Sequence, residues 1–186
     1  MTQRDAGAQC GLPAPDGGEH NSLADRLWRL GLRCAYRLQL VVWYVLRSHV
    51  RGAYVAVWHA ERVLVIRNSY RRRLSLPAGM VKRGERLAET AARELAEEVG
   101  IVVSGDALRY VGQIVDASGR VVDHAHIFEL YCEEEPVLRV DGREVIWADF
   151  LSPEQALERG LVSVVRRYLN RPTKPRSSVV CCRGRH

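Results

Sequence analysis

The order of apolar and polar positions divides the chain into a helical N-terminal part and a strand-rich middle. Between residues 22 and 47, leucines and aromatic residues recur at spacings of three and four, which is typical of an amphipathic helix. From residue 51 the period changes, because 53–59 and 62–68 are dense in β-favouring residues and flank a short turn at Ala60–Glu61. The pattern therefore predicts a long helix followed by a β-hairpin.

The rest of the pattern alternates strands with helices. Residues 86–99 give the clearest helix, with an apolar residue at every fourth position along one face. A short apolar run at 74–76 ends at Pro77 and predicts a short strand, and Ser152–Pro153 is a typical helix start. The further expected elements are a strand pair formed by 108–116 and 121–132 around Ser118–Gly119, a strand at 145–150 and a last helix at 161–170.

Chain length and local composition set the expected domain limits. The 186 residues are enough for one domain with a sizeable core and flanking segments. Residues 1–21 are rich in Gly, Pro and polar residues, so we expect them to be disordered, like the basic tail 171–186. This leaves 22–50 as a basic helical extension and 51–170 as the folded domain.

The distribution of charge argues against a nucleic-acid-binding domain. The net charge is +6, of which residues 1–50 carry +2, the middle 51–170 carries −1 and the tail carries +5. A folded nucleic-acid-binding domain carries its positive charge on the folded surface. We therefore predict no specific nucleic-acid partner.

Cysteine usage and the first residues favour a cytoplasmic location. The five cysteines are odd in number and form no C-x-x-C pair, which argues against a disulfide framework and against a zinc site. The first twenty residues lack the apolar core of a secretory signal peptide. A reducing cytoplasm is the expected compartment.

The N-terminal helix leaves several partners open. Four arginines lie along one side of the predicted helix at spacings of three and four: Arg26, Arg29, Arg33 and Arg37. The uninterrupted apolar run 40–46 is far shorter than the ~20 residues that span a bilayer. The helix can lie as a peripheral element at the inner face of the membrane, with its arginines on anionic headgroups. Alternatively, it packs on the domain or on a second subunit.

Three glutamates in the helix 86–99 point to metal chemistry. Glu94, Glu97 and Glu98 stand at positions i, i+3 and i+4, so they share one helical face. Like charges at these spacings destabilise a helix by about 0.2–0.5 kcal/mol per pair, and the negative end of the helix dipole adds to this cost. Nearby cations or a bound hard metal ion would offset the repulsion. Carboxylates together with water and phosphate oxygens suit Mg²⁺.

Glycines and an arginine around these glutamates have physical reasons of their own. Gly100 follows the helix and can adopt the left-handed conformation that ends it. Gly79 and Gly84 allow the preceding loop to turn sharply and bring Glu85 back toward the helix. Arg93 can hold a carboxylate in a bidentate grip, and Glu85 is a candidate for it.

The segment from residue 79 to residue 101 resembles the Nudix box, G-x5-E-x7-R-E-U-x-E-E-x-G-U, where U is a bulky aliphatic residue. Every fixed position is filled, by Gly79, Glu85, Arg93, Glu94, Leu95, Glu97, Glu98, Gly100 and Ile101. The order of the expected strands and helices also resembles the Nudix fold. This resemblance implies an α/β fold, an α/β/α sandwich with a mixed sheet, over about 51–170. The amphipathic helix that precedes this domain lies outside the family pattern.

The resemblance further implies a pyrophosphohydrolase that needs Mg²⁺ or Mn²⁺ and splits a diphosphate linked to another moiety, usually a nucleoside diphosphate derivative. It implies Glu85, Glu94, Glu97 and Glu98 as metal ligands, and Glu94, Glu98 and Arg93 as catalytic residues. Within this set Glu94 is also a candidate general base, Arg93 orients Glu85, and Gly79 and Gly100 shape the backbone. The alternative is a non-catalytic Nudix-fold module that binds a nucleotide or acts as a membrane-associated sensor.

Two sets of residues outside the box are further candidates. Arg71, Arg72 and Arg73 precede the box, and they either grip a substrate phosphate or form a solvated turn. The family does not place its base uniformly, so Glu129 and Glu144 are candidates for an additional base; otherwise they are solvent-facing carboxylates. No sequence feature indicates which diphosphate compound is the substrate.

Overall fold

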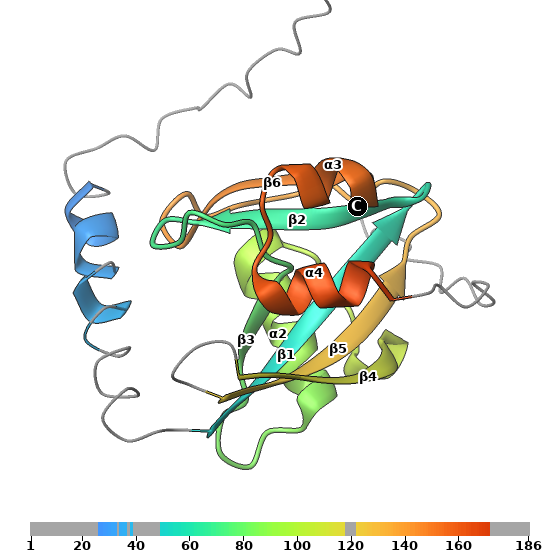
Figure 1. The fold of residues 1–186 in the computed structure, drawn as a ribbon, viewed down its shortest axis with the longest axis horizontal. Coiled ribbons are helices and arrows are strands. Elements are labelled where there is room, and N and C mark those ends of the chain that lie inside the picture. Colours follow the sequence, from blue (N-terminus) through green and yellow to red (C-terminus); the bar gives the residue numbers. More distant parts are fainter. Residues whose placement is uncertain (1–25, 33, 37, 39–48, 118–121, 172–186) are drawn as a thin grey trace, which may run out of the picture.

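A computed structural model describes residues 26–32, 34–36, 38, 49–117 and 122–171 (Figure 1). Within these residues an N-terminal helix precedes an α/β domain. The strands of the domain are β1 (His49–His59), β2 (Arg62–Asn68), β3 (Ala78–Met80), β4 (Arg109–Asp116), β5 (Val122–Tyr131) and β6 (Val145–Leu151). Its helices are α2 (Leu87–Val99), α3 (Pro153–Glu158) and α4 (Ser163–Leu169), with a 3₁₀ turn η1 (Gly105–Ala107).

The strands form one mixed sheet in the order β4-β5-β1-β2-β6, with β3 also paired to β1. β1 runs parallel to β5 along most of its length and antiparallel to β2 and β3. It pairs with β3 near its start, at Gly52–Tyr54, and with β2 only at its end, at Trp58 and His59. β2 and β3 therefore both lie on the side of β1 that faces away from β5, and they pair with opposite ends of β1.

Both faces of the sheet are covered by helices. Along β1, alternate residues face opposite layers, so that Val55 and Val57 share a core with Leu95 of α2. Ala56 and Trp58 share the other core with residues of α3 and α4, such as Val165. Figure 1 shows α2 and α4 on opposite sides of the sheet. A central strand covered on both faces is buried along its length rather than alternately, as the burial of residues 52–58 shows. The predicted α/β/α sandwich with a mixed sheet is confirmed.

Local signals in the sequence set the hairpin and the helix ends. Ala60 and Glu61 both take left-handed conformations, with φ of 43° and 65°, as the tight turn of a two-residue hairpin requires. The Ser152 hydroxyl accepts the N–H of Gln155 at 3.3 Å, and Pro153 occupies the first turn of α3. The predicted hairpin and helix start are both present.

The predicted strand at 74–76 is wrong. Leu74 and Ser75 make only isolated bridges, and the strand of this region is β3, which begins after Pro77. The apolar residues at 74–76 are buried because they fill the core on the α4 side of the sheet. Pro77 lacks an N–H but accepts the N–H of Val55 through its carbonyl at 2.9 Å, so regular pairing starts beyond it.

The described part of the N-terminal segment is helical at 26–32, 34–36 and 38. The remaining positions of the predicted helix, the flanking segment 1–21, the tail 172–186 and the turn at Ser118–Gly119 lie outside the described residues. Among the helices that are described, none has the length and apolar character that a bilayer crossing needs. Membrane contact and dimerisation through 22–47 stay predictions.

The buried face of α2 gives a test of the fold. Leu95 is fully buried between the glutamates of the box, so Leu95→Ala should lower the free energy of unfolding by about 2–5 kcal/mol. Val102 lies just beyond the helix and is 84% exposed, so Val102→Ala should change it by less than about 0.5 kcal/mol. Urea unfolding followed by circular dichroism measures both. Equal effects of the two substitutions would contradict the packing described above.

Candidate active site

α2 positions the carboxylates of the box because its apolar face is fixed in the core. Leu95 and Val99 are fully buried, so the glutamates beside them are carried to the rim of the sheet near β3. The helix ends at Gly100, whose φ of 75° is left-handed. The N–H groups of Gly100 and Ile101 return to the carbonyls of Ala96 and Leu95 at 3.2 Å, which satisfies the last turn of the helix.

Arg93 lies at the centre of the acidic group and contacts three of its glutamates. It grips Glu85 with two bonds, Nε to Oε1 at 2.8 Å and Nη2 to Oε2 at 3.1 Å. Its Nη1 also reaches Glu94 Oε1 at 2.6 Å and Glu97 Oε2 at 3.1 Å. The hydrogen bonds from Arg93 lower the pKa of Glu85 to about 2. Three carboxylates around one guanidinium leave the cluster negatively charged.

Glu98 is the buried carboxylate of the set. It is 5% exposed and accepts the backbone N–H of Ala78 at 2.9 Å and the side-chain amide of Asn68 at 3.3 Å. Burial raises the pKa of Glu98 to about 8, and the charges of Glu94 and Glu144 add to this effect, while the Ala78 N–H opposes it. The pKa of Glu94 is also raised, chiefly by burial. A positive charge placed between these groups would favour their ionised forms.

A cavity of about 610 Å³ brings four glutamates together. They are Glu94, Glu97 and Glu98 from α2 and Glu144 from the loop before β6. That loop is held by Asp141, whose Oδ1 accepts the backbone N–H of Glu144 at 3.1 Å. The hydroxyl of Tyr70, from the loop after β2, donates to Glu144 Oε1 at 3.1 Å. Glu85 is not among the residues that line this cavity, because Arg93 holds it to one side.

Gly79 leaves the room that Glu94 occupies. A Cβ atom at this position would lie 1.8 Å from Glu94 Oε1 and 2.0 Å from its Cδ. Both are far closer than non-bonded contact allows. The glycine is therefore needed for the close approach of the Glu94 carboxylate to β3, and not for a left-handed backbone.

These carboxylates are suitable ligands for a divalent cation, but they are not arranged around a common metal position. Among the described residues, no three carboxylate, imidazole or thiol groups stand close enough to hold a metal ion as they are arranged. The reason is visible in the contacts, since Arg93 occupies oxygens of Glu94 and Glu97. Carboxylate oxygens such as those of buried Glu98, half-buried Glu94 and exposed Glu144 are nevertheless the hard ligands that Mg²⁺ and Mn²⁺ prefer.

Of the three consecutive arginines, only Arg71 reaches the main cavity. A second cavity of about 360 Å³ adjoins the first, and Arg71, Tyr36, Tyr54 and Asp123 line both. Arg72 and Arg73 line only this side cavity and are exposed. Arg71 therefore shares a cavity with the carboxylates, whereas Arg72 and Arg73 line only the side cavity.

Glu129 lies away from the box and within a separate network. It is 7% exposed and pairs with Arg109, and its oxygens accept the hydroxyls of Tyr168 at 2.5 Å and Tyr131 at 2.8 Å. Trp58 Nε1 donates to the Tyr168 hydroxyl at 3.0 Å and extends the network into the core. Glu129 lines neither cavity. Of the two candidates for an additional base, the structure brings only Glu144 to the site.

Several residues of the site were not predicted from the sequence. Asn68 ends an apolar strand and holds Glu98, and a lone buried Asn in such a run is the signal that could have indicated it. The Tyr54 hydroxyl donates to Asp123 Oδ2 at 2.7 Å in the wall shared by the two cavities. No local pattern predicts this contact, because the pair meets only when β1 and β5 lie side by side.

The family of the chain follows from comparison with known domains. A model of the NUDIX domain matches residues 48–171. The chain belongs to the Nudix family. Members of this family generally use divalent metal ions, and the assignment supports a hydrolase that acts on pyrophosphate bonds. No protein in a search of curated sequences matched the chain.

Solved structures share the Nudix fold at low sequence identity. A MutT protein from Methanosarcina mazei Go1 has a TM-score of 0.58 at 23% identity, covering 67% of this chain and 92% of that chain. An Ap4A hydrolase from C. elegans gives 0.55 at 16% identity, with coverage of 64% and 92%. The NUDIX domain of NrtR from Shewanella oneidensis, complexed with ADP ribose, gives 0.56 at 15%, with coverage of 66% and 84%. Identities this low show the fold alone.

The contact at Gly79 predicts a substitution that damages the site but spares the fold. Gly79→Ala should displace the flexible end of Glu94 and weaken Mn²⁺ binding by about 10-fold or more, with little change in thermal unfolding. Isothermal titration with MnCl₂ measures the affinity. In a Glu94→Ala background the clash is absent, so Gly79→Ala should have no further effect. A further loss in that background would contradict the steric explanation.

Proposed function

We propose that the protein is a pyrophosphohydrolase that uses Mg²⁺ or Mn²⁺ to cleave a nucleoside diphosphate derivative. The observation that supports this most strongly is the shared cavity of Glu94, Glu97, Glu98 and Glu144 beside a complete Nudix box. Four carboxylates that line one cavity repel one another, and burial raises the pKa of Glu98, so the arrangement is costly without a cation. A phosphate chain with a bound divalent cation accounts for this arrangement.

The residues of the box would have different roles in metal binding. Glu94, Glu97 and Glu98 would hold the cation, which when bound neutralises diphosphate charge and makes water more acidic. The Ala78 N–H and the Asn68 amide orient Glu98, so this ligand is fixed before substrate arrives. Arg93 keeps Glu85 ionised and positioned beside Glu94 and Glu97. Glu85 would then act as an outer ligand through water.

Glu144 is the better placed candidate for a base from outside the box. It lines the main cavity together with Glu94 and Glu98, and its negative charge adds to the raised pKa of both. The hydrogen bond from Tyr70 orients Glu144 Oε1, and the other carboxylate oxygen would take the water proton. Arg71 also lines the cavity and would contact the phosphate chain.

Fold neighbours support the substrate class in general terms. One is described as an Ap4A hydrolase and another as a Nudix domain in complex with ADP ribose. Both ligands are nucleotides with phosphoanhydride bonds, which agrees with the combination of carboxylates and Arg71 found here. The leaving group stays open, and a panel of nucleoside diphosphate derivatives tests it.

Activity and the role of Glu98 are tested together. With Mg²⁺ or Mn²⁺, the purified protein should hydrolyse at least one compound of the panel, and Glu98→Gln should lower kcat/KM by at least about 100-fold. Glu89→Gln is the matched control, since Glu89 lies on the same helix, is exposed and lines neither cavity. Chromatography of the nucleotide products follows the reaction. Binding of nucleotides without any turnover would favour the non-catalytic sensor instead.

The choice of base is tested by comparing two glutamates. Glu144→Gln should lower kcat by about 10²–10⁴-fold, the contribution typical of general base catalysis, with KM nearly unchanged. Glu129→Gln should mainly lower the melting temperature, because Glu129 serves the network with Arg109 and Tyr168. Steady-state kinetics and thermal unfolding of both variants separate the roles. A larger loss of kcat in Glu129→Gln would reverse the assignment.

A further inference from the structure

The N-terminal helix, at residues 26–32, 34–36 and 38, contacts the loops that carry residues of the site. Arg29 Nε donates to the carbonyl of Gly142, in the loop before β6, at 3.0 Å. The ring of Tyr36 lies 4.7 Å from the ring of Tyr70, in the loop after β2. Arg29 and Tyr36 are seven residues apart, so they share one face of the helix. This face is turned toward the domain.

The helix reaches the site through Tyr36 and Arg71. The Cζ atom of Arg71 lies 5.3 Å from the centre of the Tyr36 ring and 5.7 Å from that of Tyr70. Both distances are within the range of a cation–π interaction. The guanidinium is thus fixed by an aromatic residue of the domain and by one from outside the matched family segment 48–171.

Arg71 has capacity left for an anion. Its Nε is buried and has no hydrogen-bond partner among the described residues. Arg71 lines both cavities, and the larger of them is also lined by Glu94, Glu97 and Glu98. The guanidinium is held by two aromatic rings and by a hydrogen bond with Tyr36. An arginine held in this way suits a phosphate oxygen, because its planar donors are fixed in one orientation.

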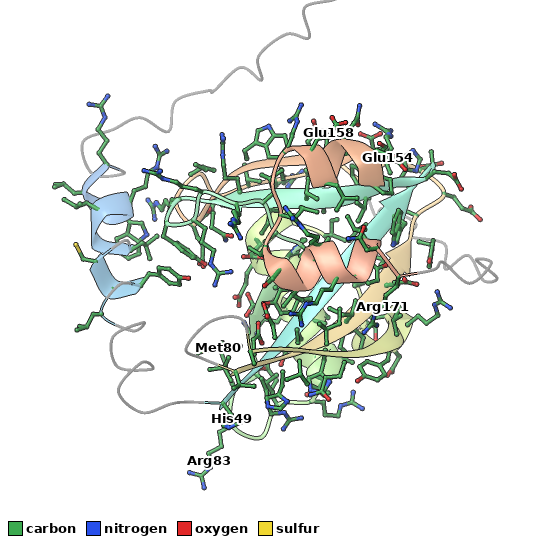
Figure 2. All side chains as sticks on the ribbon, viewed as in Figure 1. His49, Met80, Arg83, Glu154, Glu158 and Arg171 are labelled. Atoms are coloured by element: carbon green, nitrogen blue, oxygen red, sulfur yellow. The ribbon has the colours of Figure 1, made fainter. Side chains whose placement is uncertain are left out.

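Core packing does not account for the docking of this helix. A helix that docks only for stability buries its apolar face. Here Leu27, Leu30 and Leu38 remain 68%, 56% and 67% exposed. Among the described residues, the polar and ring contacts with the domain involve arginines and aromatic side chains. In Figure 2 the helix presents side chains to the adjacent loops while others extend away from the domain.

We propose that Tyr36 is a positioning residue of the substrate site, which holds Arg71 in the orientation that binds the diphosphate of the substrate. The N-terminal helix is then part of the enzyme's substrate cleft, although it lies outside the family's domain. This inference rests on the proposed function for the identity of the anion. It assigns to the extension a role that neither the Nudix box nor the fold provides.

The test is a double-mutant cycle on the full chain with a probe that cannot be hydrolysed. Isothermal titration measures the affinity for methylenediphosphonate with saturating Mg²⁺. Arg71→Ala should weaken binding by about 10- to 100-fold, the loss expected for a charged hydrogen bond. Tyr36→Ala should weaken it by about 3- to 10-fold through the lost cation–π contact. In the double variant, Tyr36→Ala should add almost nothing to the loss from Arg71→Ala.

Matched variants separate positioning from folding. Tyr36→Phe keeps the ring but removes the hydroxyl that hydrogen-bonds Arg71, so it should bind more weakly than the unmodified chain and more tightly than Tyr36→Ala. Leu38→Ala, on the same helix, and Arg83→Ala, an exposed arginine that points away from the domain in Figure 2, should leave binding unchanged. Independent, multiplying losses from Tyr36→Ala and Arg71→Ala would overturn the proposal. So would a Tyr36→Ala variant that binds like the Leu38→Ala control, or an unmodified chain that does not bind the probe.

The two proposals fail in different ways. If the unmodified chain cleaves a compound of the panel and Tyr36→Ala still binds the diphosphonate normally, the positioning role is wrong and the enzyme assignment stands. If the cycle shows coupling but no compound is cleaved, the anion site is real and the hydrolase assignment is wrong. Circular dichroism of each variant confirms that the comparison is made between folded proteins.

Discussion

Mutual repulsion of carboxylates at one end of α2 is the constraint on which the site depends. Glu94 and Glu98 share a cavity with Glu144, and burial makes the negative charge of Glu98 costly. The fold tolerates this because Leu95 and Val99 secure the opposite face of the helix in the core. Arg93 offsets only part of the charge. A divalent cation bound with a phosphate chain would neutralise the remaining negative charge. Relief of the repulsion that destabilises the free protein would then contribute to the free energy of binding.

The groups around these glutamates fix the positions of their carboxylates. Gly79 makes room for Glu94, and the Ala78 N–H and Asn68 hold Glu98 in place. Asp141 shapes the loop that presents Glu144. The same cavity is also lined by Arg71, itself held by aromatic rings of two different parts of the chain. Acidic and basic side chains therefore line one cavity, which is the electrostatic form expected of a site for a metal-bound polyphosphate.

Local signals predicted most of the fold, and long-range contacts limited the rest. The Ala60–Glu61 turn, the helix 86–99 and the Ser152–Pro153 start are specified by residues close together in sequence. The strand at 74–76 was misplaced because buried apolar residues look alike whether they pair in a sheet or fill a core. The box glutamates could be predicted because fixed spacing on one helix sets their face. The contacts of Asn68, Asp123 and Tyr36 could not, since each depends on elements that meet only in the folded chain.

The most direct test of the central claim is thermal unfolding of the unmodified protein and of Glu98→Gln, each with and without Mn²⁺. If these carboxylates are kept together for a cation, then without metal Glu98→Gln should melt at the same temperature as the unmodified chain or above it, because a buried carboxyl that is costly to ionise has been replaced by a neutral amide. With Mn²⁺ at about 100 times its dissociation constant, only the unmodified chain should gain stability, by about 2.7 kcal/mol. A Glu98→Gln variant that is less stable without metal and gains equally from Mn²⁺ would contradict the account.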